Sequence, residues 1–138
     1  MIDAREYLKS FQRQDAKIAL RERQLQSLRN RLTSLSVPTD KEQVSHTKNV
    51  SVMSETIARI VDMEKEIDFL KDRLDESKYE AYHYFDQIPI DSASLLTDRY
   101  IEGKTNRKIC EERFITERHI RRLMSEAINE LQEVFDKA

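Results

Sequence analysis

Three arginines lie within five residues near the C-terminal end of the chain: Arg118, Arg121 and Arg122. On a wheel of 100° per residue they share one side with other polar residues, and apolar residues occupy the opposite side. The polar side also holds Glu117 and Ser125, and the apolar side holds Ile120, Leu123, Met124, Ala127, Ile128 and Leu131. A guanidinium group can donate two hydrogen bonds to guanine O6 and N7, or to a phosphate. The pattern predicts a helix that buries its apolar side and presents arginines to DNA, although basic helix faces are also common where a helix is simply solvated.

Helix-boundary signals place this helix last in a series of three. Thr105 precedes a short helix predicted over 106–113, and Thr116 precedes a helix predicted from Glu117 to about Phe135, each threonine in the position of an N-terminal cap. Gly103, the only glycine, predicts the end of the preceding helix. A helix, a glycine turn, a short helix and a longer basic helix are typical of a helix-turn-helix, whose second helix enters the DNA major groove.

The first of these three helices follows Pro89, which should end a long preceding helix. Asp91 or Ser92 is expected to cap the new one. Cys110 is expected to pack where the two helices of the motif touch.

The rest of the chain predicts an antiparallel helical hairpin resembling a coiled coil. Apolar residues recur every seven residues in two segments, predicted as helices from about 3 to 34 and from 52 or 54 to 87, with a polar loop near 36–50. The repeats are Phe11, Ile18, Leu25 and Leu32, then Met53, Ile60, Ile67 and Leu74. The net charge is +5 over residues 5–31 and −5 over 54–87, which favours pairing of the two segments. The aromatic residues at the end of the second segment, Tyr79, Tyr82, Tyr84 and Phe85, are interpreted as the core that joins the hairpin to the C-terminal module.

Composition narrows the possible functions. One glycine is too few for a phosphate-binding loop, and one cysteine excludes an intrachain disulfide. No apolar run approaches the roughly 20 residues of a membrane span. We therefore expect an all-α protein of the cytoplasm that is not an enzyme and has no cofactor, metal or membrane partner.

The stretch RYIEGKTNRKICEERFITERHIRRLMSEAINEL (99–131) resembles region four of bacterial sigma factors. The whole chain resembles small phage-encoded transcription regulators of the ArpU-like (autolysin regulatory protein) type, through IARIVDMEKEID (57–68) and LLTDRYIEGKT (95–105) as well. The resemblance implies binding to promoter DNA and control of phage late genes in a bacterial host. By this analogy the groove contacts fall on Glu117, Arg118, Arg121 and Arg122, with Thr116 as cap and phosphate ligand. The full set of predicted DNA-contacting residues is Thr105, Lys108, Thr116, Glu117, Arg118, His119, Arg121, Arg122 and Ser125.

The chain departs from this pattern at the turn, where it has Arg113 and Phe114. One expectation is that Arg113 extends its charge into solvent while Phe114 fills the core space. The other is that the short helix ends at a different residue.

Two functions from different classes remain open at this point. The first is a DNA-binding regulator with a hairpin over 1–88 and a DNA-binding module over 89–138. The second is a helical interaction protein that binds RNA polymerase or another phage regulator without reading DNA. The hairpin could form a homodimer or contact polymerase.

Overall fold

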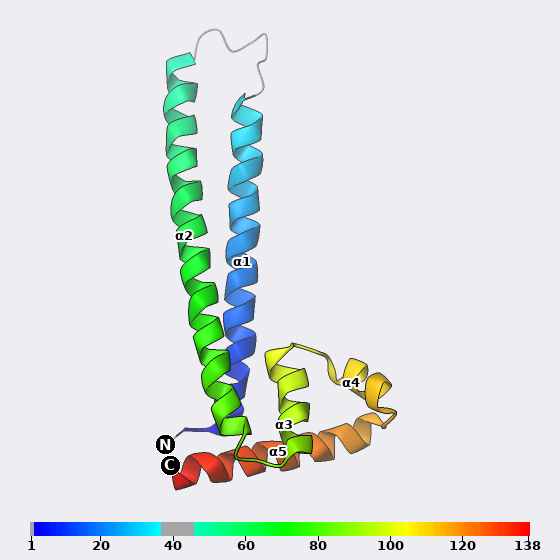
Figure 1. Ribbon diagram of the computed structural model, residues 1–138. Coiled ribbons are helices and arrows are strands. Elements are labelled where there is room, and N and C mark those ends of the chain that lie inside the picture. The colour runs from blue at the N-terminus through cyan, green and yellow to red at the C-terminus, as the bar shows by residue number, and fades with distance from the viewer. Residues whose placement is uncertain (1, 37–45) are drawn as a thin grey trace. The chain divides into compact units, whose positions relative to one another are not determined.

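The computed structural model describes residues 2–36 and 46–138, and the elements found there are all helical. They are α1 (Ala4–Ser36), α2 (His46–Phe85), α3 (Ile90–Leu96), the π-helical segment η1 (Thr97–Ile101), α4 (Asn106–Arg113) and α5 (Glu117–Lys137) (Figure 1). The expected all-α class is confirmed. Within the described ranges, no helix combines the length and the apolar character needed to cross a bilayer.

The main departure in helix boundaries is the start of α2. The helix begins at His46, six residues before the earlier of the two expected starts. The predicted loop is therefore wrong for residues 46–50, and also for Ser36, which ends α1. No proline or glycine interrupts residues 46–54, and a polar stretch without a helix breaker can extend a helix by one or two turns. The remainder of that predicted loop, residues 37–45, lies outside the described residues.

The start of α3 also differs from the expectation. Pro89 is the N-cap residue, with φ −55° and ψ 145°, and no side chain caps the helix. Asp91 and Ser92 lie inside the first turn, so the prediction that one of them caps it was wrong. The backbone N–H of Ala93 donates to the carbonyl oxygen of Pro89 at 2.9 Å. Proline already has the extended geometry that a cap residue needs, so the helix starts two or three residues earlier than expected.

The chain divides into two compact units. One comprises Ala16–Arg73, and the other combines Met1–Asp15 with Leu74–Ala138. This division differs from the expected one between residues 88 and 89, because the first turns of α1 and the last turns of α2 pack with the C-terminal helices.

In the unit of residues 16–73, α1 and α2 pack against each other as an antiparallel pair. Leu25, Ile60 and Ile67 are buried together, and other apolar side chains pack against them. Three ion pairs join the two helices: Arg21 with Glu66, Arg29 with Glu64, and Glu22 with Lys71, each at 3.0 Å. The opposite charges of the two segments do meet, as the sequence indicates. The hydrogen bond from Lys71 to Glu22 raises the pKa of that lysine.

The second unit is closed by contacts between the two ends of the chain. Gln132 accepts a hydrogen bond from the backbone N–H of Ala4 at 2.8 Å and donates one to the carbonyl oxygen of Ile2 at 2.9 Å. The ring of Tyr7 makes edge contacts with Tyr84 and Phe135. Burial raises the pKa of the Tyr7 hydroxyl group well above its ordinary value of 10.0.

The aromatic residues at the end of α2 are divided between core and surface. Phe85 is buried and Tyr84 joins the aromatic cluster, as expected, whereas Tyr79 and Tyr82 are exposed, which the sequence interpretation did not foresee.

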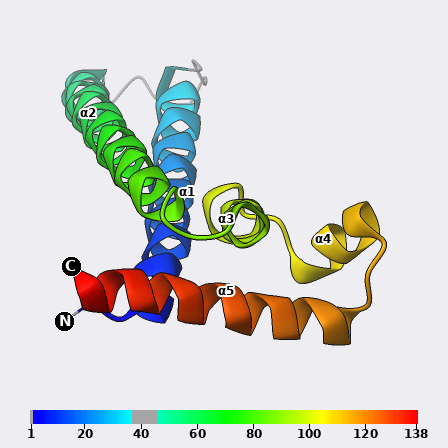
Figure 2. The same ribbon diagram turned by 60° about the horizontal axis from the view of Figure 1, so that its bottom comes forward.

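The remaining helices of this unit form a compact group. α3 packs on α5, and α4 contacts both η1 and α5 (Figure 2). Ile109, Ile120 and Leu131 are fully buried, and Cys110 is buried as expected. The buried side of α5 therefore packs against α3 and α4.

Candidate nucleic-acid interface

The two sides of α5 differ as the helical wheel predicts. Its buried residues are Ile120, Met124, Ala127, Ile128, Leu131 and Phe135, while Leu123 is only half-buried. Its exposed polar residues in the first three turns are Glu117, Arg118, Arg121, Arg122, Ser125 and Glu126. The helix is therefore anchored along one side, and the other side carries three arginines into solvent.

Both threonines act as N-terminal caps. The hydroxyl oxygen of Thr116 accepts a hydrogen bond from the backbone N–H of His119, and that of Thr105 accepts one from the backbone N–H of Lys108, each at 3.1 Å. Thr116 has the extended backbone of a cap residue, with φ −80° and ψ 159°. A threonine hydroxyl that accepts in this way still has its own hydrogen to donate to an oxygen of a ligand. Capping leaves the other N–H groups of the first turn of α5 facing outward, as an anion site needs.

The arginines of α5 are weakly engaged. An Nη2 atom of Arg122 lies 3.2 Å from Nδ1 of His119, and Arg121 lies 3.9 Å from Glu117 one turn earlier. Arg118 forms no ion pair within the described part of the chain. Exposed pairs of this kind contribute about 0–1 kcal/mol, so an incoming phosphate can displace them readily.

The turn between α4 and α5 differs from one expectation. Phe114 has φ 57° and ψ 46°, and its side chain is 94% exposed, so the prediction that it fills the core was wrong. The backbone N–H of Ile115 then donates to the carbonyl oxygen of Cys110, which closes the turn. The short helix ends at Arg113, as the cap positions indicate.

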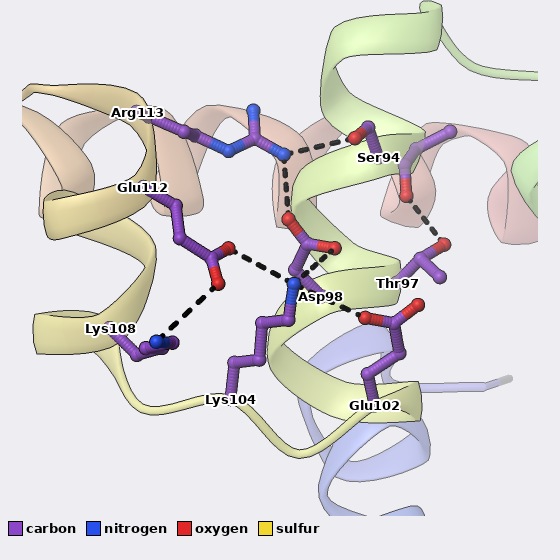
Figure 3. Close-up of polar contacts among 9 residues, drawn as sticks. Ser94, Thr97, Asp98, Glu102, Lys104, Lys108, Glu112 and Arg113 are labelled. Atoms are coloured by element: carbon purple, nitrogen blue, oxygen red, sulfur yellow. Dashed lines mark hydrogen bonds and ion pairs between the residues drawn. The ribbon is translucent and has the colours of Figure 1, made fainter.

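Arg113 does not extend into solvent, contrary to the same expectation. Its guanidinium group donates to Asp98 Oδ2 and to Ser94 Oγ, both at 2.9 Å (Figure 3). The Asp98 side chain is only 18% exposed and that of Arg113 31%. This partly buried ion pair ties the end of α4 to α3 and η1.

A second cation completes the network around Asp98. The Nζ atom of Lys104 lies 3.0 Å from Glu112, 3.4 Å from Glu102 and 3.8 Å from Asp98 (Figure 3). The hydrogen bond to Glu112 is the main cause that raises the pKa of Lys104. The other carboxylate oxygen of Glu112 lies 3.9 Å from Lys108. Lys108, which the sequence includes among DNA contacts, is therefore paired within α4.

The π-helical segment places Asp98 in this network. The backbone N–H of Glu102 donates to the carbonyl oxygen of Thr97 five residues earlier, and the Thr97 hydroxyl donates to Ala93. Such wide turns are rare and often lie beside functional sites. Sequence reasoning missed the pair of Asp98 and Arg113, because the two residues are 15 positions apart and share no periodic pattern.

The predicted site residues fall into two groups. Those of the α5 front lie on one helix and face solvent together: Thr116, Glu117, Arg118, Arg121, Arg122 and Ser125, with His119 half-buried beside them. Thr105 and Lys108 lie at the start of α4. No group of three or more histidine, cysteine or acidic residues among the described positions could hold a metal ion.

Comparison of the chain with family models, with curated proteins and with solved structures gave no match.

Proposed function

We propose that the protein is a DNA-binding transcription regulator in which α4 and α5 form a helix-turn-helix. The first turns of α5 would lie in the major groove, and α4 would cross the backbone, as in other proteins with this motif. The observation that carries the proposal is the exposed face of Arg118, Arg121 and Arg122 on a helix whose opposite face is packed against the rest of the unit.

The electrostatics of α5 favour an anionic partner. Long arginine side chains near the start of a helix can reach base edges, while the helix N-terminus and the Thr116 hydroxyl can contact phosphate. Arginine contacts with phosphates release counterions, so binding should weaken steeply as salt rises. Packing of α5 against α3 and α4 keeps the arginine face in place before DNA arrives, which lowers the entropy lost on binding.

More specifically, we propose that the protein is a phage regulator that acts on late promoters in the cytoplasm of a bacterial host. The resemblance to ArpU-like regulators and to sigma region four supports it. In this proposal the protein binds DNA without catalysing a reaction or using a cofactor. RNA polymerase is the natural second partner, since a sigma-like module acts beside it.

The direct test is a gel shift with DNA from the protein's own upstream and late-promoter regions. The double variant Arg121→Ala with Arg122→Ala should lose binding, because it removes two donors from the arginine face while leaving the buried side of α5 intact. A matched control removes two exposed cations elsewhere, by Arg23→Ala with Lys65→Ala, and should bind as the wild type does. Circular dichroism would check that all three proteins are equally helical.

The same assay separates the two classes of function. Wild-type protein that shifts promoter DNA alone, with loss only in the α5 variant, supports the regulator. A shift that appears only with RNA polymerase and survives the α5 substitutions would instead assign the chain as an interaction protein. Equal shifts by all variants without polymerase would refute the proposed contacts.

A further inference from the structure

An open groove of about 520 Å³ lies along one side of α2 near its C-terminal end, in the unit that contains residues 74–138. At 100° per residue, the side chains that line the groove cover an arc of about 140°. They are Asp75, Glu76, Tyr79, Glu80 and His83, and all five are exposed. Ala81 and Phe85 of the same stretch are buried, so α2 packs within its unit on a different side.

An aromatic ring lies in the middle of the groove. The side chain of Tyr79 is 67% exposed, and its ring makes an edge contact with the ring of His83, with the centroids 5.3 Å apart. Tyrosine presents a large apolar surface with a polar end, and it is enriched at protein–protein interfaces for this reason. The contact with His83 holds the Tyr79 ring in place while most of its surface remains available to a partner.

The carboxylates of the groove have no cation beside them. Asp75, Glu76 and Glu80 form no ion pair within the described part of the chain. The Tyr84 hydroxyl donates a long hydrogen bond of 3.4 Å to Glu80, which leaves the charge of that carboxylate in place. Lys78, the only lysine or arginine between residues 74 and 86, is half-buried and does not line the groove. Three negative charges therefore border the exposed tyrosine ring.

We propose that this groove binds a basic α-helix of another protein. Arginines or lysines one turn apart on that helix would pair with the three carboxylates, and one of these cations would lie over the ring of Tyr79. A helix fits, because the groove follows just over two turns of α2 and side chains three or four residues apart share one side of a helix. The proposal does not depend on DNA binding by α5.

Two other kinds of ligand fit this groove less well. A nucleic acid is disfavoured, because the three carboxylates repel phosphate groups. A bound metal ion is also disfavoured, since no group of three or more histidine, cysteine or acidic residues in the described ranges is close enough to hold one. The cations that match these charges must instead be spread along a partner, as they are on a basic helix.

The test measures binding of two labelled synthetic peptides to the full chain by fluorescence anisotropy. The patterned peptide is an alanine-rich helix of about 20 residues, with arginines and leucines three or four residues apart on one side. The dispersed peptide has the same composition, with its arginines distributed around the helix. We expect the patterned peptide to bind at least about 5-fold more tightly, because only its arginines can reach the carboxylates on one side of α2 together.

Two variants of the groove should weaken binding of the patterned peptide. The carboxylate variant combines Asp75→Asn, Glu76→Gln and Glu80→Gln, and it should raise the dissociation constant by about 10-fold, because it removes three exposed ion pairs. Tyr79→Ala should raise the dissociation constant by about 3-fold, because it removes the ring beneath a cation. All four positions are exposed, so the variants should keep the fold, which circular dichroism would check.

Two control variants make the same chemical changes outside the groove. Glu55→Gln, Asp62→Asn and Glu133→Gln together remove three exposed carboxylates, and Phe69→Ala removes a ring that is 58% exposed. Both should bind the patterned peptide as the wild type does. Equal binding of the two peptides, equal losses in groove and control variants, or no binding to the wild type would each overturn the proposal. Sedimentation of the chain alone gives a further check: a wild-type dimer that the carboxylate variant abolishes would assign the groove to a second copy instead.

Discussion

The two helices of the proposed DNA-binding motif begin alike but use their cations differently. Each starts after a threonine that caps its third backbone N–H at 3.1 Å. In and just before α4, the cations contact carboxylates of the same unit: Lys104, Arg107, Lys108 and Arg113. In α5, Arg118 and Arg122 contact no carboxylate among the described residues, and Arg121 makes only a long contact with Glu117.

This difference shows that the charge of a segment does not by itself locate a binding surface. Residues 99–122 carry eight basic and four acidic side chains, and the sequence alone treats the basic ones as a single block. In the structure, Arg113 and Lys104 join α4 to the preceding helical segments, and Arg107 and Lys108 pair with carboxylates within α4. The arginines of α5 face solvent instead. The excess charge available to a partner therefore lies on α5. The contrast can be tested by removing cations from each helix in turn.

The largest expected effect comes from Arg118→Ala on α5. A bidentate arginine contact to a base is worth about 1–3 kcal/mol, so DNA affinity should fall by about 5- to 150-fold. The free energy of unfolding should change by less than about 0.5 kcal/mol, because the side chain is exposed and forms no ion pair. Fluorescence anisotropy with labelled promoter DNA and urea unfolding would measure the two quantities. Normal affinity in this variant would remove Arg118 from the interface.

The second largest effect is expected for Arg113→Met on α4, which should lower the stability of the fold. The variant leaves Asp98, only 18% exposed, with Lys104 at 3.8 Å as its remaining cation. Breaking a fully buried pair costs about 3–5 kcal/mol, and partial exposure of both partners reduces the expected loss of stability to about 1–2 kcal/mol. Urea unfolding would measure it. Arg107→Met is the control, since Arg107 and Glu111 are 84% and 62% exposed and should contribute little. Equal stability of both variants would contradict a structural role for Arg113.

Much of the fold follows from local signals in the sequence. The heptad spacing of Leu25, Ile60 and Ile67 predicts residues that are buried together, and Thr105, Thr116 and Gly103 mark the helix ends correctly. These features succeed because each is determined within one or two helical turns. Gly103, with φ +74°, has the left-handed backbone typical of the residue that follows a helix.

The features that sequence reasoning missed depend on contacts between distant segments. The hydrogen bonds of Gln132 with Ile2 and Ala4 join residues almost the full chain apart, and no spacing rule indicates them. The pair of Asp98 and Arg113 requires the wide turn of η1, which has no clear sequence signature. For the candidate site, the amphipathic pattern predicts which α5 residues are exposed, but it does not distinguish a paired cation such as Lys108 from an unpaired one.

A smaller effect should come from the two caps. Thr105→Ala and Thr116→Ala each remove one hydrogen bond to a helix N-terminus, which should lower stability by about 1 kcal/mol. Only Thr116→Ala should also weaken DNA binding, because its hydroxyl lies beside the arginine face and is proposed to contact phosphate. Thr116→Ser keeps the hydroxyl and serves as the control for both measurements. Equal loss of DNA affinity in the two alanine variants would show that the N-termini of α4 and α5 contribute equally to DNA binding. That result would contradict the proposed difference between the two helices.

The smallest effect concerns Phe114, which connects the two helices. A left-handed backbone costs an L-residue about 1–2 kcal/mol, and glycine largely avoids this cost. The ring is 94% exposed, so removing it takes little from the core, while the greater freedom of glycine in the unfolded chain offsets part of the gain. Phe114→Gly should therefore raise the free energy of unfolding by about 0.5 kcal/mol or more, and Phe114→Ala, which keeps the Cβ atom, should gain less. Thermal and urea unfolding of both variants would measure the difference. A loss of stability in both would mean that the ring makes a stabilising contact, and the turn would then be set by Phe114 itself rather than by the packing of α4 and α5 on either side of it.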